Sequence, residues 1–202
     1  MASNLGLLAA RAIIGAGIFS HGAQKGLGWF GGPGPAGAGQ FMASLGFKPG
    51  ESYARAAYTN EMVAGALILT GALGPVGPAL LISTMVVAAR SVHWPNGFFA
   101  QNGGYELSAV YSAGAAALGS SGYGSIAIDH LLGIDNVFAK PGRPMWVLVL
   151  GVAGAIAVLS QREVAESSAP APAPEPASDA SSASAHPNGQ PLGTSGDIGS
   201  NV

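Results

Sequence analysis

Cysteine is absent from the 202-residue sequence, and its absence excludes several kinds of site. Without a thiol the chain forms no disulfide, offers no thiolate nucleophile and ligates neither an iron–sulfur cluster nor a thiolate zinc ion. Direct sulfur chemistry by this chain is therefore not expected, and we predict no metal site.

Charge is also scarce. Only 9% of the residues are charged while 49% are hydrophobic, and the mean hydropathy is +0.38. A soluble domain carries about a quarter charged residues, so this chain has too few charges to cover a water-facing surface. The net charge is −2, and no basic run of the kind that binds phosphate backbones occurs. We therefore predict an integral membrane protein whose partner is the lipid bilayer and not nucleic acid.

The apolar residues that are present fall into five segments, at about 5–24, 54–73, 79–92, 105–118 and 145–159. About twenty helical residues cross a hydrocarbon core of about 30 Å, and the last three segments are shorter than that. We predict an all-α fold: a four-transmembrane-helix bundle in residues 1–133, then a connector and a fifth transmembrane helix in 134–162. Residues 163–202, rich in alanine, proline and serine, are expected to form a disordered tail. Residues 26–40 hold seven glycines and two prolines and are expected to form a loop.

Helices that alternate in direction bring polar groups from four helix ends to one membrane face. The end of the first segment, the start of the second, the end of the third and the start of the fourth share that face. Lys25 belongs to it, and the residues that we expect to bind a ligand or handle protons there are His21, Glu61, Arg90, His93 and Glu106. The glycine-rich loops beside it are expected to cap the face with Trp29, Trp94, Asn96, Phe98, Phe99 and Tyr105.

Ionised groups at membrane depth are costly, so they are expected to point into the bundle and to pair. Glu61 or Glu106 can neutralise Arg90, and Arg11, a structural charge in the first helix, can reach toward Glu61. These pairs either fix the helix register or form a site. Two histidines on different helices are also compatible with haem, but we favour a quinone hydrogen bond or a proton relay, and the cofactor stays unknown.

Two strings carry a family resemblance: HGAQKGLGWFGGPG at residues 21–34 and HWPNGFFAQNGGYE at 93–106. With an acid in the second apolar segment and a Gly-Pro turn after it, they closely resemble the DoxX family of small bacterial membrane proteins over residues 5–133. The resemblance implies a four-helix bundle, multi-pass in the bacterial cytoplasmic membrane. The family includes DoxD-like subunits of thiosulfate:quinone oxidoreductase, and proposed roles lie in redox or oxidative-stress complexes with soluble redox proteins or other membrane subunits.

Three functions remain open. The first is a membrane subunit of a quinone-linked redox or oxidative-stress complex, which makes the chain at most one part of an enzyme. The second is a non-catalytic anchor or assembly scaffold for soluble partner proteins. The third, small-solute transport, is less favoured because five helices are few for alternating access and no inverted repeat is visible, although a homo-oligomer would weaken that objection.

Overall fold

The computed structural model describes residues 2–138 and 142–163, and all regular elements in these ranges are helical. Five helices are long: α1 (Ala2–Leu27), α3 (Gly50–Thr70), α4 (Val76–Ala88), α5 (Glu106–Ser121) and α8 (Arg143–Leu159). The short ones are α2 (Gly34–Ser44), α6 (Ile128–Leu131) and α7 (Asp135–Phe138). The tail that the sequence predicts lies outside the described residues from position 164 onward.

Helix α4 does not stop at Ala88. A π-helical turn (Ala89–His93) and a 3-10 turn (Trp94–Asn96) continue it, so one helical segment runs from Val76 to Asn96. Two further 3-10 turns, Trp29–Gly31 and Ala100–Asn102, lie in the glycine-rich connections after α1 and α4. The third predicted helix therefore extends to the aromatic loop that follows it.

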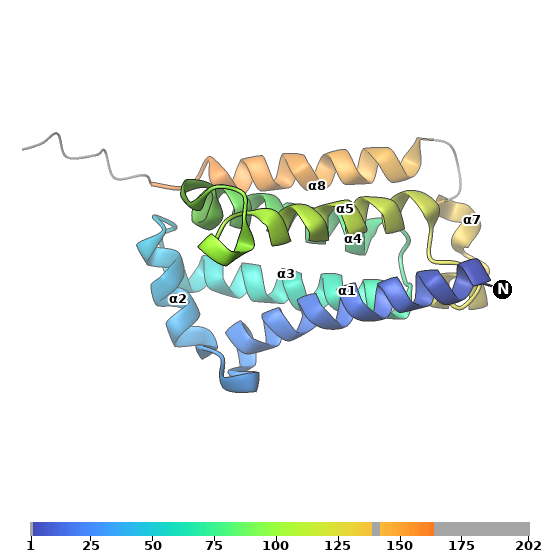
Figure 1. The fold of residues 1–202 in the computed structure, drawn as a ribbon, viewed down its shortest axis with the longest axis horizontal. Coiled ribbons are helices and arrows are strands. Elements are labelled where there is room, and N and C mark those ends of the chain that lie inside the picture. The colour runs from blue at the N-terminus through green and yellow to red at the C-terminus, as the bar shows by residue number, and fades with distance from the viewer. Residues whose placement is uncertain (1, 139–141, 164–202) are drawn as a thin grey trace, which may run out of the picture. The chain divides into compact units, whose positions relative to one another are not determined.

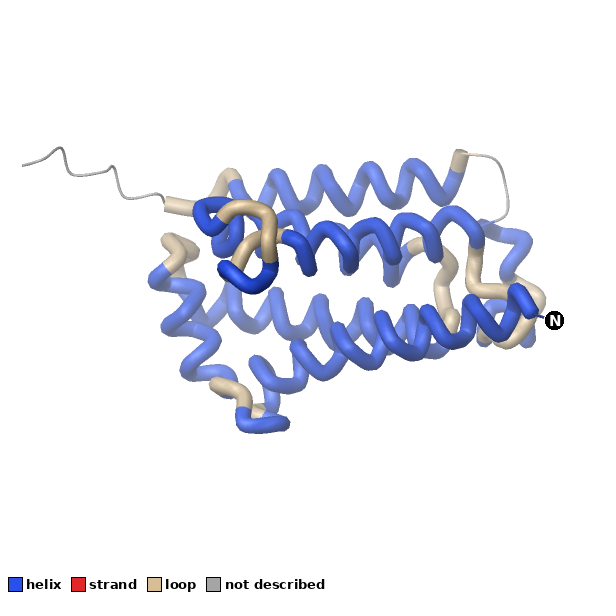
Figure 2. Tube along the Cα trace, viewed as in Figure 1, coloured by secondary structure: helices blue, strands red, loops and turns tan. Residues whose placement is uncertain are grey.

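The long helices lie side by side and alternate in direction (Figures 1 and 2). Helix α1 packs on α3, α3 packs on α4, and α4 packs on both α5 and α8. The end of α1, the start of α3, the end of the α4 segment and the start of α5 meet at one end of the bundle, which we call the loop end. The sequence predicted this arrangement, because successive helices were expected to alternate in direction.

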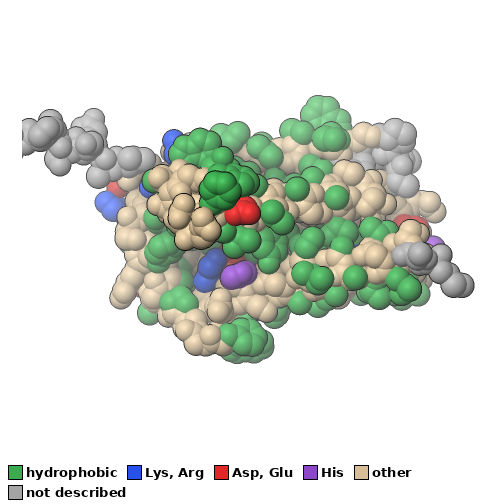
Figure 3. Space-filling view, viewed as in Figure 1, with side chains coloured by type: hydrophobic (Ala, Val, Ile, Leu, Met, Phe, Trp, Pro, Cys, Tyr) green, Lys and Arg blue, Asp and Glu red, His purple; other side chains and the backbone are tan. Residues whose placement is uncertain are grey.

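The core lies where these helices meet, and its buried members are mostly aliphatic: Ile18, Ala64, Ile68, Leu81, Ile82, Met85, Ala115, Leu118, Tyr123, Ala127 and Leu148. Large apolar side chains also cover the outside of the bundle (Figure 3). Ile13 is 73% exposed and Leu150 is 66% exposed. Contiguous apolar surface of this kind is expected to face lipid.

Two helical segments in the described ranges, Ser3–Leu27 and Val76–Asn96, are long and apolar enough to cross a membrane, and Met145–Leu159 is apolar but shorter. The α3 helix spans 21 residues but carries Glu51, Arg55 and Glu61. The α5 helix has only 16 residues. Helices at all five predicted positions are therefore present, while four or five membrane crossings stay a prediction.

The expectation of a loop throughout residues 26–40 is wrong, because α2 begins at Gly34. Pro35 lies in the first helical turn, where a missing N–H costs nothing. Gly39 packs against α3, since an added Cβ would lie 3.2 Å from the Glu51 side chain. Pro35 and Gly39 suggested a loop, but Pro35 starts helix α2 and Gly39 packs it against α3.

Candidate functional site

The site begins with the close approach of α1 to α3. A Cβ added to Gly15 would lie 2.6 Å from the backbone nitrogen of Leu69, and one added to Gly65 would lie 2.6 Å from the carbonyl oxygen of Gly15. Further along, a Cβ on Gly22 would lie 2.8 Å from the carbonyl oxygen of Tyr58. Glycines at such contacts let membrane helices touch through their backbones. Side chains one turn beyond can therefore meet.

Glu61 of α3 and Lys25 of α1 form a salt bridge through Lys25 Nζ and Glu61 Oε1. The Glu61 side chain is only 3% exposed, whereas that of Lys25 is 35% exposed. His21 lies one helical turn before Lys25 and is exposed. Figure 3 shows a histidine and basic side chains gathered between α1 and α5. Lys25 and Glu61 thus form an ion pair, and His21 lies one helical turn from Lys25; we call these three residues the cluster.

Glu61 has one carboxylate oxygen in use and one unused. Its Oε2 atom is buried and has no hydrogen-bond partner within the described residues. Leaving a buried polar atom unsatisfied costs about 1–3 kcal/mol, and more when it is charged. Such an atom is an acceptor to which a ligand, a water molecule or a proton can bind.

His93 and Glu106, which the sequence assigned to the same site, hold the connecting loop together. His93 Nδ1 lies 2.7 Å from the carbonyl oxygen of Gly103. The Ala100 N–H donates to Glu106 Oε2 at 2.9 Å, and Asn96 Nδ2 donates to the Gly103 carbonyl at 3.2 Å. These polar groups therefore fix the loop conformation.

Aromatic rings cover this loop. The rings of Trp94 and Tyr105 stack at 5.2 Å, Phe98 meets Tyr105 edge-on at 5.5 Å, and Phe98 meets Phe99 at 5.4 Å. Trp94, Phe98 and Phe99 are nevertheless 47–59% exposed, and Trp29 of the other loop is 51% exposed. The predicted cap is an ordered structure that presents aromatic surface outward.

The predicted pairing of Arg90 with Glu61 or Glu106 is wrong. Glu61 pairs with Lys25, and Glu106 accepts the backbone N–H of the loop. Arg90 is exposed, and no salt bridge or side-chain hydrogen bond involves it in residues 2–138 and 142–163. Of the five candidate residues, then, only His21 and Glu61 remain in the cluster, and Lys25 is the partner that the site prediction left out.

A model of the DoxX family matches residues 6–94. This segment of the chain is a DoxX domain. Together with the apolar helices, it indicates a membrane protein. The match contains the cluster of His21, Lys25 and Glu61 and ends at Trp94, so most of the aromatic loop lies beyond it. No curated protein and no solved structure matches the chain.

Arg11, in the DoxX segment, does not reach toward Glu61 as predicted. Its Nε donates to the carbonyl of Ile68 at 3.0 Å, and its Nη2 donates to that of Leu69 at 2.9 Å. Its Nη1 donates to the carbonyls of Tyr123 and Ile126 at 3.2 and 2.6 Å. Arg11 is 2% exposed. It therefore ties α1 to the end of α3 and to the segment after α5, at the end of the bundle that we call the Arg11 end.

Asp129 completes the Arg11 end. Its carboxylate accepts the backbone N–H groups of Leu73 and Gly74 at 2.8 and 2.6 Å. Gly71, which ends α3 with a φ of 71°, leaves room there, because a Cβ would lie 2.7 Å from Arg11 Cζ. Asp129 and Arg11 thus satisfy backbone groups that the end of α3 and the α3–α4 turn leave unpaired.

A histidine–carboxylate pair lies nearby on the surface. His130 Nδ1 lies 2.9 Å from Asp135 Oδ2, and this hydrogen bond holds the pKa of the Asp135 carboxyl below its usual range. Across the described residues, no group of three or more histidine, aspartate and glutamate side chains has the arrangement of a metal site. The pair is half-exposed, and we assign no ligand to it.

Proposed function

We propose that this protein is an integral membrane subunit of a redox complex and that Glu61 exchanges a proton with a quinone-type carrier bound at the loop end. The observation that carries the proposal is the Oε2 atom of Glu61, which is buried and has no hydrogen-bond partner in residues 2–138 and 142–163. A quinone headgroup takes up protons on reduction and releases them on oxidation, so its site requires a proton acceptor or donor at hydrogen-bond distance.

The other two members of the cluster fit this role. Lys25 provides the positive charge that a buried carboxylate requires. His21 is exposed at the surface of α1, one turn from Lys25, and an imidazole both accepts and donates protons, so it can pass protons between Glu61 and water. We further propose that the bundle crosses the bacterial cytoplasmic membrane several times.

Binding of a quinone headgroup analogue to the protein in nanodiscs tests the proposal. Wild-type protein should bind the analogue saturably, and Glu61→Gln should weaken binding by about tenfold or more, the equivalent of about 1.4 kcal/mol. Glu106→Gln is the matched control, because a glutamine oxygen still accepts the Ala100 N–H. The combined Lys25→Gln and Glu61→Gln variant removes both charges together, so no buried charge is left unpaired. Wild-type protein without saturable binding, or equal affinity in Glu61→Gln, would refute the proposal.

A second function, as an anchor for a soluble partner protein, is favoured by one specific observation. The ordered aromatic loop exposes Trp94, Phe98 and Phe99 at the loop end. Aromatic side chains are enriched at protein interfaces. If the loop docks a partner, Phe98→Ala with Phe99→Ala should abolish co-purification of that partner while Glu61→Gln retains it. Equal recovery with both variants would contradict the anchor function.

A further inference from the structure

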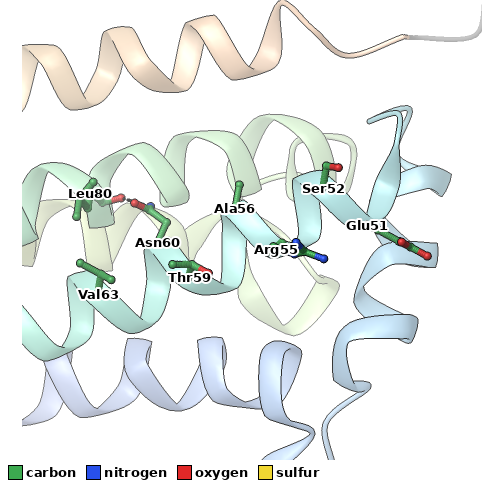
Figure 4. A pocket seen from close by; sticks show the side chains of 8 residues that line it. All are labelled: Glu51, Ser52, Arg55, Ala56, Thr59, Asn60, Val63 and Leu80. Carbon is green, nitrogen blue, oxygen red and sulfur yellow. Dashed lines mark hydrogen bonds between the residues drawn. The ribbon is translucent and has the colours of Figure 1, made fainter.

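A groove of about 540 Å³ runs along the outer side of α3, away from the cluster at Glu61. Its walls are Glu51, Ser52, Arg55, Ala56, Thr59, Asn60 and Val63 of α3 with Leu80 of α4. Figure 4 shows these side chains following one another along α3, with Asn60 directed toward Leu80. All of the α3 residues except Asn60 are exposed. The groove is therefore a surface of the bundle.

Asn60 fixes the position of this surface. Its Nδ2 donates to the Leu80 carbonyl at 3.0 Å and to Thr84 Oγ1 at 2.6 Å. Unlike Asn60, the two charged residues at the start of the groove have no side-chain partner among the described residues. Glu51 and Arg55 form no salt bridge and no side-chain hydrogen bond within the described ranges. A charged or polar side chain that faces lipid is unfavourable, and such groups in membrane helices usually face protein.

We propose that a second copy of this chain covers the groove, with α3 of one copy against α3 of the other. Both copies have the same orientation in the membrane, so the two-fold axis is perpendicular to the bilayer and the two α3 helices run parallel. A two-fold interface must complement itself. Glu51 and Arg55 meet that condition, because they carry opposite charges one helical turn apart.

The dimensions of the helix agree with this pairing. Four residues rise about 6 Å along a helix, a distance that an arginine side chain covers, so Arg55 of one copy reaches Glu51 of the other. Ser52 and Ala56, one turn apart on the same side, are small enough for the two backbones to approach. In this parallel arrangement each Arg55 reaches diagonally to Glu51 of the other copy, so the two-fold symmetry supplies both ion pairs.

Cysteine cross-linking in native membranes tests the interface, because the chain has no cysteine of its own. A disulfide forms only where two Cα atoms come within about 7 Å. Ala56→Cys and Thr59→Cys should give a covalent dimer on oxidation, at least fivefold above Val110→Cys. Val110 is the control because it lies 61% exposed on the outside of α5. No dimer at either α3 position, equal yields at all three, or an adduct whose mass is not twice that of the chain would overturn the proposal.

Charge reversal tests the pairing itself in the Ala56→Cys background. Glu51→Arg and Arg55→Glu should each lower the dimer yield at least threefold, because like charges then face one another. The double reversal, Glu51→Arg with Arg55→Glu, should restore it. The melting temperature of each variant in detergent separates a lost interface from a lost fold. Single reversals that melt like the wild type and still cross-link fully, or a folded double reversal that does not recover, would overturn the charge pairing.

Discussion

Replacing Gly65 by alanine should separate the two helices that carry Lys25 and Glu61. The new Cβ would lie 2.6 Å from both the Gly15 carbonyl oxygen and the Phe19 nitrogen. An ordinary Cβ contact begins near 3.4 Å. Both obstructing atoms belong to the α1 backbone, so they cannot turn away as a side chain can. Helix α1 must therefore move outward by about 0.8 Å.

The size of the effect follows from this displacement. A gap of about 0.5–1 Å forfeits a quarter to a half of the dispersion energy of each affected contact, and overpacking generally costs about 1–3 kcal/mol. Alanine favours the helix by about 0.5–1 kcal/mol over glycine, which offsets part of this loss. We expect a net destabilisation of about 1–2 kcal/mol, which lowers the melting temperature by about 2–8 °C for a chain of this size.

Thermal unfolding in nanodiscs measures the change, and Gly6→Ala is the matched control. Gly6 lies on the same helix α1, and a Cβ there would meet nothing within 4 Å. It should melt at or slightly above the wild-type temperature. If Gly65→Ala and Gly6→Ala had the same melting temperature, the backbone contact between α1 and α3 would not be the feature that positions the cluster.

Three further predictions concern the Arg11 end and the membrane. Arg11→Lys should destabilise the protein by about 2–4 kcal/mol in the same unfolding assay, because an ammonium group cannot reach four carbonyls in different directions. Burial raises the pKa of Tyr123 above its ordinary value, so wild-type stability should be full below pH about 10 and fall above it as the unfolded chain ionises. Tyr123→Phe should remove that alkaline decline without loss at neutral pH, since the hydroxyl has no hydrogen-bond partner among the described residues. Single-tryptophan variants in sealed, uniformly oriented vesicles test whether α8 crosses the membrane. A membrane-impermeant quencher added outside should quench the fluorescence of Trp29 and Trp94 to the same extent, and it should quench Trp146 only if it does not quench those two. Identical quenching of all three would contradict a crossing by α8.

The helices and their order were predictable because apolar segments and Gly-Pro turns determine them locally. The alternation of direction also placed the end of α1 beside the start of α3, and Lys25 and Glu61 of these helices form an ion pair. Helix α2 was not predictable in the same way, because its glycines have a packing role that depends on α3. Local composition shows that a glycine is conformationally free, but it does not show which neighbouring helix requires a residue without a Cβ at that position.

The partners of the charges could not be predicted either. Depth along the helices suggested Arg90 for Glu61, but depth says nothing about which side of a helix faces which neighbour. The glycine contacts between α1 and α3 bring Lys25 to Glu61 instead. The spacing of Gly15 and Gly22 at seven residues, two turns apart on one side of α1, is the signal in the sequence from which a close helix contact could have been found.

Two buried charges distinguish a structural end of the bundle from a candidate functional one. Arg11 directs four of its five N–H donors to backbone carbonyls, so only one N–H is left for a ligand. Glu61 is as deeply buried, but within the part of the chain that the structure describes Lys25 is its only side-chain partner and one carboxylate oxygen stays unused. Because a buried charge destabilises the fold unless it is satisfied, a residue that contributed only to stability would be expected to have complete hydrogen bonding, as Arg11 nearly does. The incomplete bonding of Glu61 is therefore the better reason to assign function to the loop end than the presence of charge alone.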